Sequence, residues 1–165
     1  MKVKIINYKK EYQIINDSKI VLETRKPKWY SSEIHFQYND KLYEIKKSSF
    51  WSLSSTIFEL KQPIGKIDFS FIKGGVIRIK KNNTTYNEYM LKKENAGKWY
   101  SSERKYVLNK KDLNPVLTIH YDPKGLTLSE DISVCFNDIH STDFVLLVCS
   151  LFLIDILYSG GGDTV

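Results

Sequence analysis

The segment that most constrains the fold of this chain is residues 144–154, where every side chain except that of Ser150 is apolar. A Ser-Thr-Asp triplet at 141–143 precedes it, and three glycines at 160–162 follow it. Such residues commonly cap the beginning and the end of a helix. We therefore predict a helix over about residues 142–158. Because this helix has no polar face, protein or lipid must surround it.

The length of the predicted helix favours protein as its surroundings. Residues 144–158 number 15 and include Asp155, whereas about 20 apolar residues are needed to cross a bilayer. Burial within the protein is the preferred prediction, and a tail-anchored membrane protein is an alternative. We expect Asp155 to reach solvent near the helix end or to pair with a lysine or arginine there, since an isolated buried carboxylate is costly. A functional proton site is its alternative role.

The pattern of the rest of the chain predicts short antiparallel strands. Up to about Phe136 the apolar residues recur with period two, and turn residues interrupt them. Asn39 and Asp40 separate two alternating stretches and predict a hairpin with a two-residue turn. Gly74 and Gly75 predict a second tight turn between two further strands. Other turns are predicted at 82–83, 95–97 and 122–125, the last leading into a strand at 126–128.

The helix and the strands together predict the architecture. A flat sheet offers only one face and cannot enclose an apolar helix. A curved sheet of about ten or more strands can wrap around the helix and remove its own exposed edges. We therefore predict a mainly β fold, a closed antiparallel β-barrel around a buried hydrophobic C-terminal helix. At this length we expect a single domain, 1–165.

The hexamer Lys-Trp-Tyr-Ser-Ser-Glu occurs twice, at residues 28–33 and 98–103. An identical match of this length in so short a chain suggests an internal duplication that relates two halves of one barrel. Reuse of one local solution, a turn that enters a strand, is the alternative. If the halves are related, Trp29 and Trp99 should start equivalent strands, and one ring of each Trp-Tyr pair should pack inward.

Composition and charge limit the setting. The 25 basic and 19 acidic residues leave a net charge of +6, which favours acidic partners such as phospholipid headgroups or nucleic acid without choosing between them. The two cysteines, Cys135 and Cys149, do not suggest the disulfide framework of a small secreted domain. Residues 1–10 contain no apolar run typical of a signal peptide. The expected location is the cytoplasm, and peripheral attachment to a membrane is an option.

The ends of the predicted helix carry a more specific pattern. Residues 143–148, Asp-Phe-Val-Leu-Leu-Val, and residues 153–155, Leu-Ile-Asp, place an acidic residue at each end of the apolar stretch. With this pattern and this architecture, the chain resembles the tubby C-terminal-like superfamily, which includes tubby proteins, phospholipid scramblases and LURP-one-related proteins. The resemblance implies a barrel threaded by a hydrophobic helix. It also implies a non-enzymatic binding function, since the tubby branch holds phosphoinositide headgroups with basic residues on the barrel.

A candidate ligand-binding set follows from that resemblance and from strand alternation. Arg78 and Lys80 alternate with apolar residues, so both should project from one face of a strand, and Lys81, Lys92 and Lys93 follow in the meander. Such cations can hold phosphate by charge-assisted hydrogen bonds. The predicted partner is an anionic phospholipid or membrane surface, or else a protein. An ordinary row of charges that faces water is the alternative.

The sequence contains little that supports a catalytic function. There is no glycine-rich phosphate loop, no Gly-x-Ser-x-Gly elbow and no Cys/His cluster with metal spacing. We therefore predict no catalytic residue, metal site or cofactor. Cys135 and His140 could pair as nucleophile and base, but no oxyanion donors accompany them. An enzyme or small-ligand carrier that uses the barrel mouth remains the alternative, and no specific nucleic acid is predicted as a partner.

Overall fold

The computed structural model describes residues 1–6, 11–28, 33–47, 49, 52, 54–70, 74–82, 84–95, 104–111, 114–123, 130–137 and 143–159. These residues form twelve β-strands and one α-helix. The strands are β1 (Lys2–Ile6), β2 (Glu11–Asn16), β3 (Lys19–Arg25), β4 (Ile34–Tyr38), β5 (Lys41–Lys47), β6 (Ser54–Glu59), β7 (Gln62–Ser70), β8 (Gly74–Lys80), β9 (Tyr86–Asn95), β10 (Arg104–Lys110), β11 (Pro115–Pro123) and β12 (Glu130–Phe136). The helix is α1 (Phe144–Ser159).

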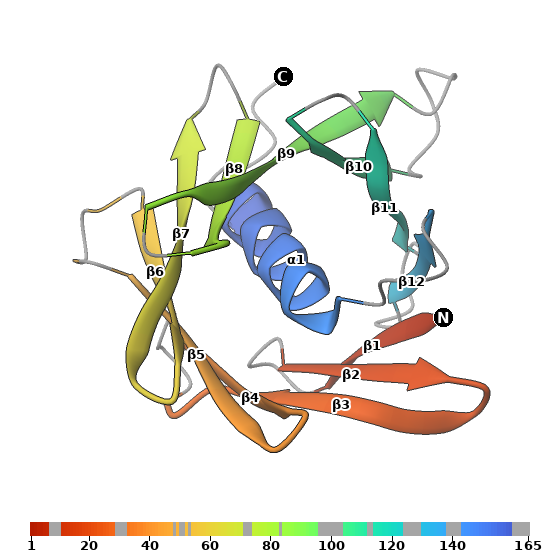
Figure 1. The fold of residues 1–165 in the computed structure, drawn as a ribbon. Helices are drawn as coiled ribbons and strands as arrows, with labels where there is room; N and C mark the ends of the chain where they lie inside the picture. Colours follow the sequence, from red (N-terminus) through yellow and green to blue (C-terminus); the bar gives the residue numbers. More distant parts are fainter. Residues whose placement is uncertain are drawn as a thin grey trace.

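The strands form one closed barrel around the helix (Figure 1). Each strand pairs antiparallel with its neighbours in the sequence, and β1 pairs with β12 to close the sheet. Helix α1 runs through the middle of the ring of strands. The structure confirms the predicted fold class, a mainly β closed barrel around a C-terminal helix.

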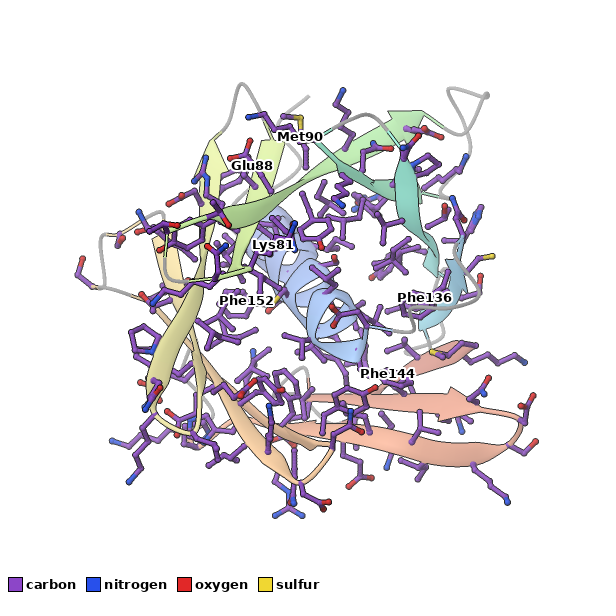
Figure 2. All side chains as sticks on the ribbon, viewed as in Figure 1. Lys81, Glu88, Met90, Phe136, Phe144 and Phe152 are labelled. Carbon is purple, nitrogen blue, oxygen red and sulfur yellow. The ribbon has the colours of Figure 1, made fainter. Side chains whose placement is uncertain are left out.

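Helix α1 forms the centre of the hydrophobic core. Each of the residues 145–154 is at most 8% exposed. The hydroxyl of Ser150 is satisfied within the helix, because it donates to the carbonyl oxygen of Leu146 at 2.8 Å. At the start of α1, the ring of Phe144 packs edge-on against Phe136 with ring centroids 6.4 Å apart (Figure 2). The strands thus cover the apolar surface of the helix, as its uniform hydrophobicity predicted.

Asp143 caps the helix N-terminus. Its Oδ1 accepts hydrogen bonds from the backbone N–H groups of Val145 (3.0 Å) and Leu146 (3.1 Å). Burial raises the pKa of Asp143, and the two backbone hydrogen bonds offset only part of that rise. Asp143 is therefore a cap that holds a partly buried charge.

We expect Asp143→Asn to be at least as stable as the wild type near neutral pH, whereas Asp143→Ala should lose about 1 kcal/mol of unfolding free energy. Asparagine keeps the cap and removes the buried charge. The folded state binds the Asp143 proton more tightly than the unfolded chain, so the cost of ionisation is absent below the ordinary aspartate pKa and grows as the pH rises. Urea unfolding at about pH 3 and about pH 7 measures this difference. An asparagine variant less stable than wild type at neutral pH would contradict it.

The two ends of the barrel differ in their connections. At the end where the even-numbered strands finish, three pairs of strands are joined by two-residue turns with positive φ, namely Asp17-Ser18, Asn39-Asp40 and Leu60-Lys61. The hairpin predicted at Asn39 and Asp40 is confirmed. We call this end the turn end and the opposite end, where the odd-numbered strands finish, the loop end. Because β12 finishes at the turn end, α1 begins there and runs towards the loop end.

The second predicted hairpin is confirmed, since β7 and β8 pair antiparallel and Gly74 has a positive φ of 77°. The position of its turn is wrong, because both glycines belong to β8. Gly75 pairs with Phe69 in the ladder between β7 and β8. Residues 71–73, which join these strands, lie outside the described residues. A Cβ atom at Gly75 would overlap the side chain of Leu153 on α1. The glycine therefore serves a close approach of the helix to the sheet.

The predicted turn at 122–125 also begins too early. Asp122 and Pro123 still belong to β11, where they pair with the first two residues of β12. The strand predicted at 126–128 lies outside the described residues. The ladder between β11 and β12 thus extends further than the Asp-Pro pair suggested. Likewise, Asn95 is the last residue of β9, and the rest of the turn predicted at 95–97 is not among the described residues.

The repeated hexamers lie mostly outside the described residues, and so do Trp29 and Trp99. The first hexamer directly precedes β4, and the second directly precedes β10. In the barrel order these two strands are six positions apart in a ring of twelve, which puts them on opposite sides. A duplicated unit of six strands would produce this placement, and the duplication itself stays a prediction.

Candidate functional site

The predicted basic residues lie in two separate places. Lys80 is the last residue of β8 and pairs with Tyr86 at the start of β9, so Lys80 and Lys81 lie at the turn end. Lys92 and Lys93 lie further along β9, roughly 20 Å from Tyr86 towards the loop end. The structure therefore brings Lys80 and Lys81 together and leaves Lys92 and Lys93 apart from them.

Arg78 belongs to an ion-pair network on the outer face of the barrel. It projects from the same face of β8 as Lys80, as alternation predicted. Its Nη1 donates to Asp68 Oδ2 at 2.5 Å, and its Nε donates to Glu88 Oε2 at 2.7 Å. Lys66 Nζ lies 3.0 Å from the other oxygen of Asp68. Two carboxylates thus compensate the charge of Arg78 within the sheet.

A denser group of cations occupies the turn end of β6 to β10. Five exposed lysines lie around the side chains of Leu60 and Tyr86, which are 58% and 51% exposed. We call this surface the basic turn sector, and its lysines are Lys61, Lys80, Lys81, Lys110 and Lys111. The described residues of these turns, 60–63, 80–82, 84–86, 110–111 and 114, include no carboxylate. Asp112 lies outside the described residues.

Hydrogen bonds tie the connections of the basic turn sector together. Lys80 Nζ donates to the carbonyl oxygen of Pro63 at 2.8 Å, which joins the end of β8 to the start of β7. The backbone N–H of Lys111 donates to the carbonyl oxygen of Glu88 at 3.0 Å, which joins the end of β10 to β9. Strands β8 and β10 flank β9 and are roughly 10 Å apart. Lysines that are distant in the sequence therefore share one surface.

Asn82 shapes the turn from which Lys81 projects. Its Oδ1 accepts hydrogen bonds from the backbone N–H groups of Thr84 (3.1 Å) and Thr85 (2.8 Å). The backbone N–H of Lys81 in turn donates to the carbonyl oxygen of Thr85 at 2.9 Å. These bonds confirm the turn predicted at Asn82, and Lys81 is exposed beside it (Figure 2).

Exposed apolar side chains gather at the same end of the barrel. The described residues include five large exposed ones, and all five lie at the turn end. Leu60 and Tyr86 belong to the basic turn sector, whereas Ile20, Val21 and Leu42 lie beside β3 and β4. Apolar side chains grouped on a surface are typical of contact with another molecule. The turn end is therefore the candidate binding end.

Sequence reasoning did not find three lysines of this surface, Lys61, Lys110 and Lys111. Their proximity depends on which strands are neighbours and on where each strand ends. Consecutive strands of an antiparallel meander are usually adjacent. Two of them, Lys110 and Lys111, form a pair that follows a predicted strand as Lys80 and Lys81 do, and this was the signal that could have found them.

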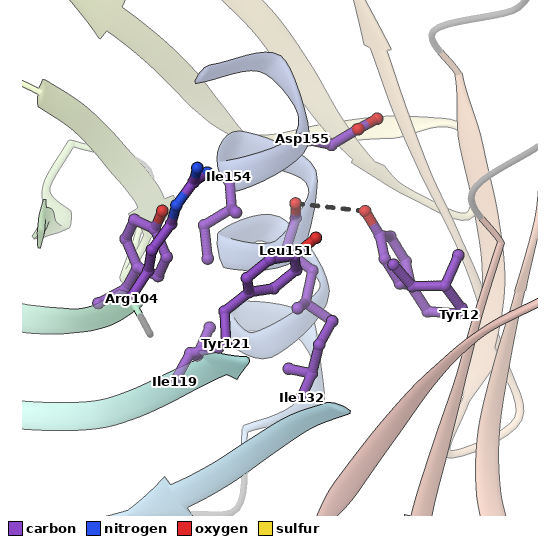
Figure 3. A pocket seen from close by; sticks show the side chains of 10 residues that line it. Tyr12, Arg104, Ile119, Tyr121, Ile132, Leu151, Ile154 and Asp155 are labelled. Carbon is purple, nitrogen blue, oxygen red and sulfur yellow. Dashed lines mark hydrogen bonds between the residues drawn. The ribbon is translucent and has the colours of Figure 1, made fainter. Parts of the chain in front are cut away.

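The loop end holds a small pocket beside the C-terminal half of α1 (Figure 3). Arg104 and Asp155 lie on opposite sides, with Leu151 and Ile154 of the helix between them. The hydroxyl of Tyr12 donates to the carbonyl oxygen of Leu151 at 3.4 Å. The volume of about 70 Å³ fits a few water molecules and is far below the ~300–1,000 Å³ of ordinary ligand clefts. This pocket gives little support to the alternative of a small-ligand carrier.

Asp155 meets a cation at the loop end, as expected for a carboxylate near the end of a buried helix. Lys26 Nζ lies 3.6 Å from Asp155 Oδ2, and the two side chains are only 9% and 16% exposed. Each charge therefore provides a partner for the other where water is scarce. This pairing favours a structural role for Asp155.

The residues considered for catalysis are dispersed. His35 Nε2 lies 3.6 Å from Glu33 Oε2 on the outer surface. Cys149 is buried in α1, and burial raises the pKa of its thiol. Cys135 is exposed, and its candidate partner His140 lies outside the described residues. In the part of the chain that the structure describes, no group of three or more His, Cys, Asp or Glu could hold a metal ion.

Comparison with known proteins does not assign a family. No family model, curated protein or solved structure matches this chain. No helix of the described part is both long and apolar enough to cross a membrane. A function is therefore inferred from the surfaces of the barrel.

Proposed function

We propose that this chain is a non-enzymatic, tubby-like barrel domain that binds anionic phospholipid surfaces through the basic turn sector. The observation that carries the proposal is the grouping of five lysines around the exposed side chains of Leu60 and Tyr86 at one end of a closed barrel. Attachment would be peripheral, on the cytoplasmic face of a membrane, where anionic lipids are concentrated.

Charge and apolar exposure favour the same ligand. A lysine close to an anionic membrane contributes about 1 kcal/mol of attraction. The ring of Tyr86 combines an apolar face with a polar hydroxyl, which suits the interface between headgroups and acyl chains. Leu60, at the tip of a tight turn, can insert its side chain into the same interface between headgroups and acyl chains. Lysines alone would attract any polyanion, and the exposed leucine adds a preference for lipid.

The resemblance to the tubby C-terminal-like superfamily supports the proposal. The architecture that it implies, a closed antiparallel barrel around a hydrophobic C-terminal helix, is the architecture of this chain. The tubby branch also holds phosphoinositide headgroups with basic residues on its barrel. Of the residues expected to do so here, Lys80 and Lys81 belong to the basic turn sector, whereas Arg78, Lys92 and Lys93 do not.

We expect the purified chain to sediment with vesicles that contain phosphatidylserine and not with vesicles of phosphatidylcholine alone. The Lys80→Ala, Lys81→Ala double variant should weaken binding by about 2 kcal/mol, or roughly 30-fold, because two lysines leave the contact surface. Lys92→Ala, Lys93→Ala is the matched control, since it removes the same charge far from the basic turn sector. It should bind nearly as well as the wild type.

Salt and an apolar variant complete the test. Raising the ionic strength from about 0.1 M to about 1 M shortens the Debye length from ~10 Å to ~3 Å and should release most of the bound protein. Leu60→Ser should weaken binding at low salt. Equal losses in the two lysine variants would assign binding to net charge rather than to this surface. Binding that survives the Lys80→Ala, Lys81→Ala change would contradict the proposed site.

A further inference from the structure

Strands β3 and β4 separate towards the turn end. They share only two residue pairs, and the one nearer the turn end joins Thr24 to Phe36. A continuous ladder would next pair Glu23 with Gln37, and no such pair forms. In Figure 1 the β2–β3 hairpin and the β4–β5 hairpin extend in different directions from this junction. The barrel is therefore split at the turn end between β3 and β4.

A β-bulge contributes to the split. The ladder between β2 and β3 shifts register so that Val21 is an extra residue between Ile20 and Leu22. A bulge bends its strand and increases the local twist, which turns the first part of β3 away from β4. Apart from Val21, residues 19–23 pair with β2 on one side, and no described strand pairs with their other side. Within the described part of the chain, that side is an open strand edge.

The split leaves a cleft on the outer surface. Residues 20–23 and Arg25 form one wall, and residues 35–40 together with Leu42 form the other. We call this feature the β3–β4 cleft. Its volume is about 830 Å³, within the ~300–1,000 Å³ of ordinary ligand clefts. Ile20, Val21 and Leu42 line it and are 53%, 42% and 42% exposed.

The open strand edge decides which occupant fits. An open edge presents a row of backbone N–H and C=O groups to which another strand can bond. An acyl chain offers no hydrogen-bonding groups, whereas an extended peptide presents a matching row of backbone groups. A second copy of this chain fits less well, because pairing the edge with itself would set two bulges against each other. A peptide from another protein is therefore the favoured occupant.

The charges along the β3–β4 cleft indicate which charges a peptide that runs antiparallel to β3 should carry. Arg25, paired with His35, lies at the limit of the cleft towards the loop end, and Asp40 lies at the turn end. Glu23 also lines the cleft, and its Oε1 accepts a hydrogen bond from Gln13 Nε2 of β2 at 2.6 Å. A peptide antiparallel to β3 would place its N-terminal part near Arg25 and its C-terminal part near Asp40. An acidic residue near the N-terminus and a basic residue near the C-terminus of the peptide complement these charges.

We propose that the β3–β4 cleft binds an extended segment of a partner protein by strand addition to β3. The segment has apolar residues at alternate positions that pack on Ile20, Val21 and Leu42, with an acidic residue before them and a basic residue after them. This cleft and the basic turn sector use different residues. A domain held at a membrane by its lysines can therefore present the cleft to a partner.

A phage-displayed library of short random peptides, selected against the full chain, tests this proposal. Selected peptides should carry the alternating apolar pattern, and their synthetic, fluorescein-labelled copies should bind saturably in fluorescence polarisation. The Val21→Lys, Leu42→Lys double variant should bind roughly tenfold or more weakly, and Lys80→Ala, Lys81→Ala should bind like the wild type. A proline at the centre of a selected peptide should abolish binding, because it removes a backbone donor.

Several outcomes would overturn the proposal. They are the absence of any saturably binding peptide, and selected peptides that bind the Val21→Lys, Leu42→Lys variant as tightly as the wild type. If no peptide binds the wild type and the Val21→Lys, Leu42→Lys variant loses vesicle binding, the cleft is a lipid site. If the wild type forms dimers and this variant does not, the edge binds a second copy of the chain. If the lysine variant does not fold, Val21→Thr, Leu42→Thr removes the same apolar contacts more gently. None of the peptide readouts depends on vesicle binding, so the two proposals fail separately.

Discussion

Replacing Leu147 with lysine should leave no soluble, folded barrel. Leu147 is fully buried in the middle of α1, within a core of apolar side chains from the helix and the strands. An unpaired ammonium group there costs several kcal/mol, compared with a total stability of about 5–15 kcal/mol for a domain. We expect the variant in the insoluble fraction of expressing cells, and any soluble remainder should lack a cooperative unfolding transition.

The matched control for this prediction is Leu60→Lys. It makes the same chemical change at a side chain that is 58% exposed. This variant should be soluble, and its unfolding free energy should lie within about 0.5 kcal/mol of the wild type. A soluble Leu147→Lys protein that unfolds cooperatively would show that the barrel does not enclose α1.

The second large effect is expected at Gly75. A Cβ atom there would overlap the side chain of Leu153, which is fully buried and held in a close-packed core. Gly75→Val should therefore lower the unfolding free energy by roughly 2–3 kcal/mol, although valine is favourable in strands. Urea unfolding followed by tryptophan fluorescence measures the change.

A second substitution identifies the cause of that effect. Leu153→Ala alone should cost about 2–5 kcal/mol, because it leaves a cavity. In the double variant, the introduced valine side chain would fill part of the space that Leu153 occupied. The double variant should therefore be more stable than the two single effects added together predict. Strict additivity would place the cost of Gly75→Val within the strand instead of at its contact with α1.

Local patterns predicted much of the fold because their causes are local. The apolar residues 144–154 required enclosure, and alternation in the preceding chain supplied the strands. The hairpin at Asn39-Asp40 was found because these residues tolerate positive φ. The turn at Leu60-Lys61 was not, since neither residue prefers positive φ, and both adopt it here. Pairing of β6 with β7 on both sides of the turn imposes that conformation.

The candidate site depended more on tertiary structure. Alternation correctly placed Arg78 and Lys80 on one face, but it did not show that Asp68 and Glu88 hold the Arg78 guanidinium. The proximity of Lys110 and Lys111 to Lys80 results from the order of β8, β9 and β10 in the barrel. Other Lys-Lys pairs, such as Lys46-Lys47, also follow the strand pattern, so the pairs alone do not show which of them share a surface.

By itself, the sequence determined that this chain has strands and a helix without a polar face. It also determined that the strands must enclose the helix. These properties follow from side-chain periodicity and capping, which involve residues close together in the chain. Only the tertiary structure decided that Gly75 makes room for α1, that five lysines share one end of the barrel and that β3 leaves an edge open. Each of these depends on which strands are neighbours and where their hydrogen-bonded pairing stops, and residues far apart in the sequence decide that together.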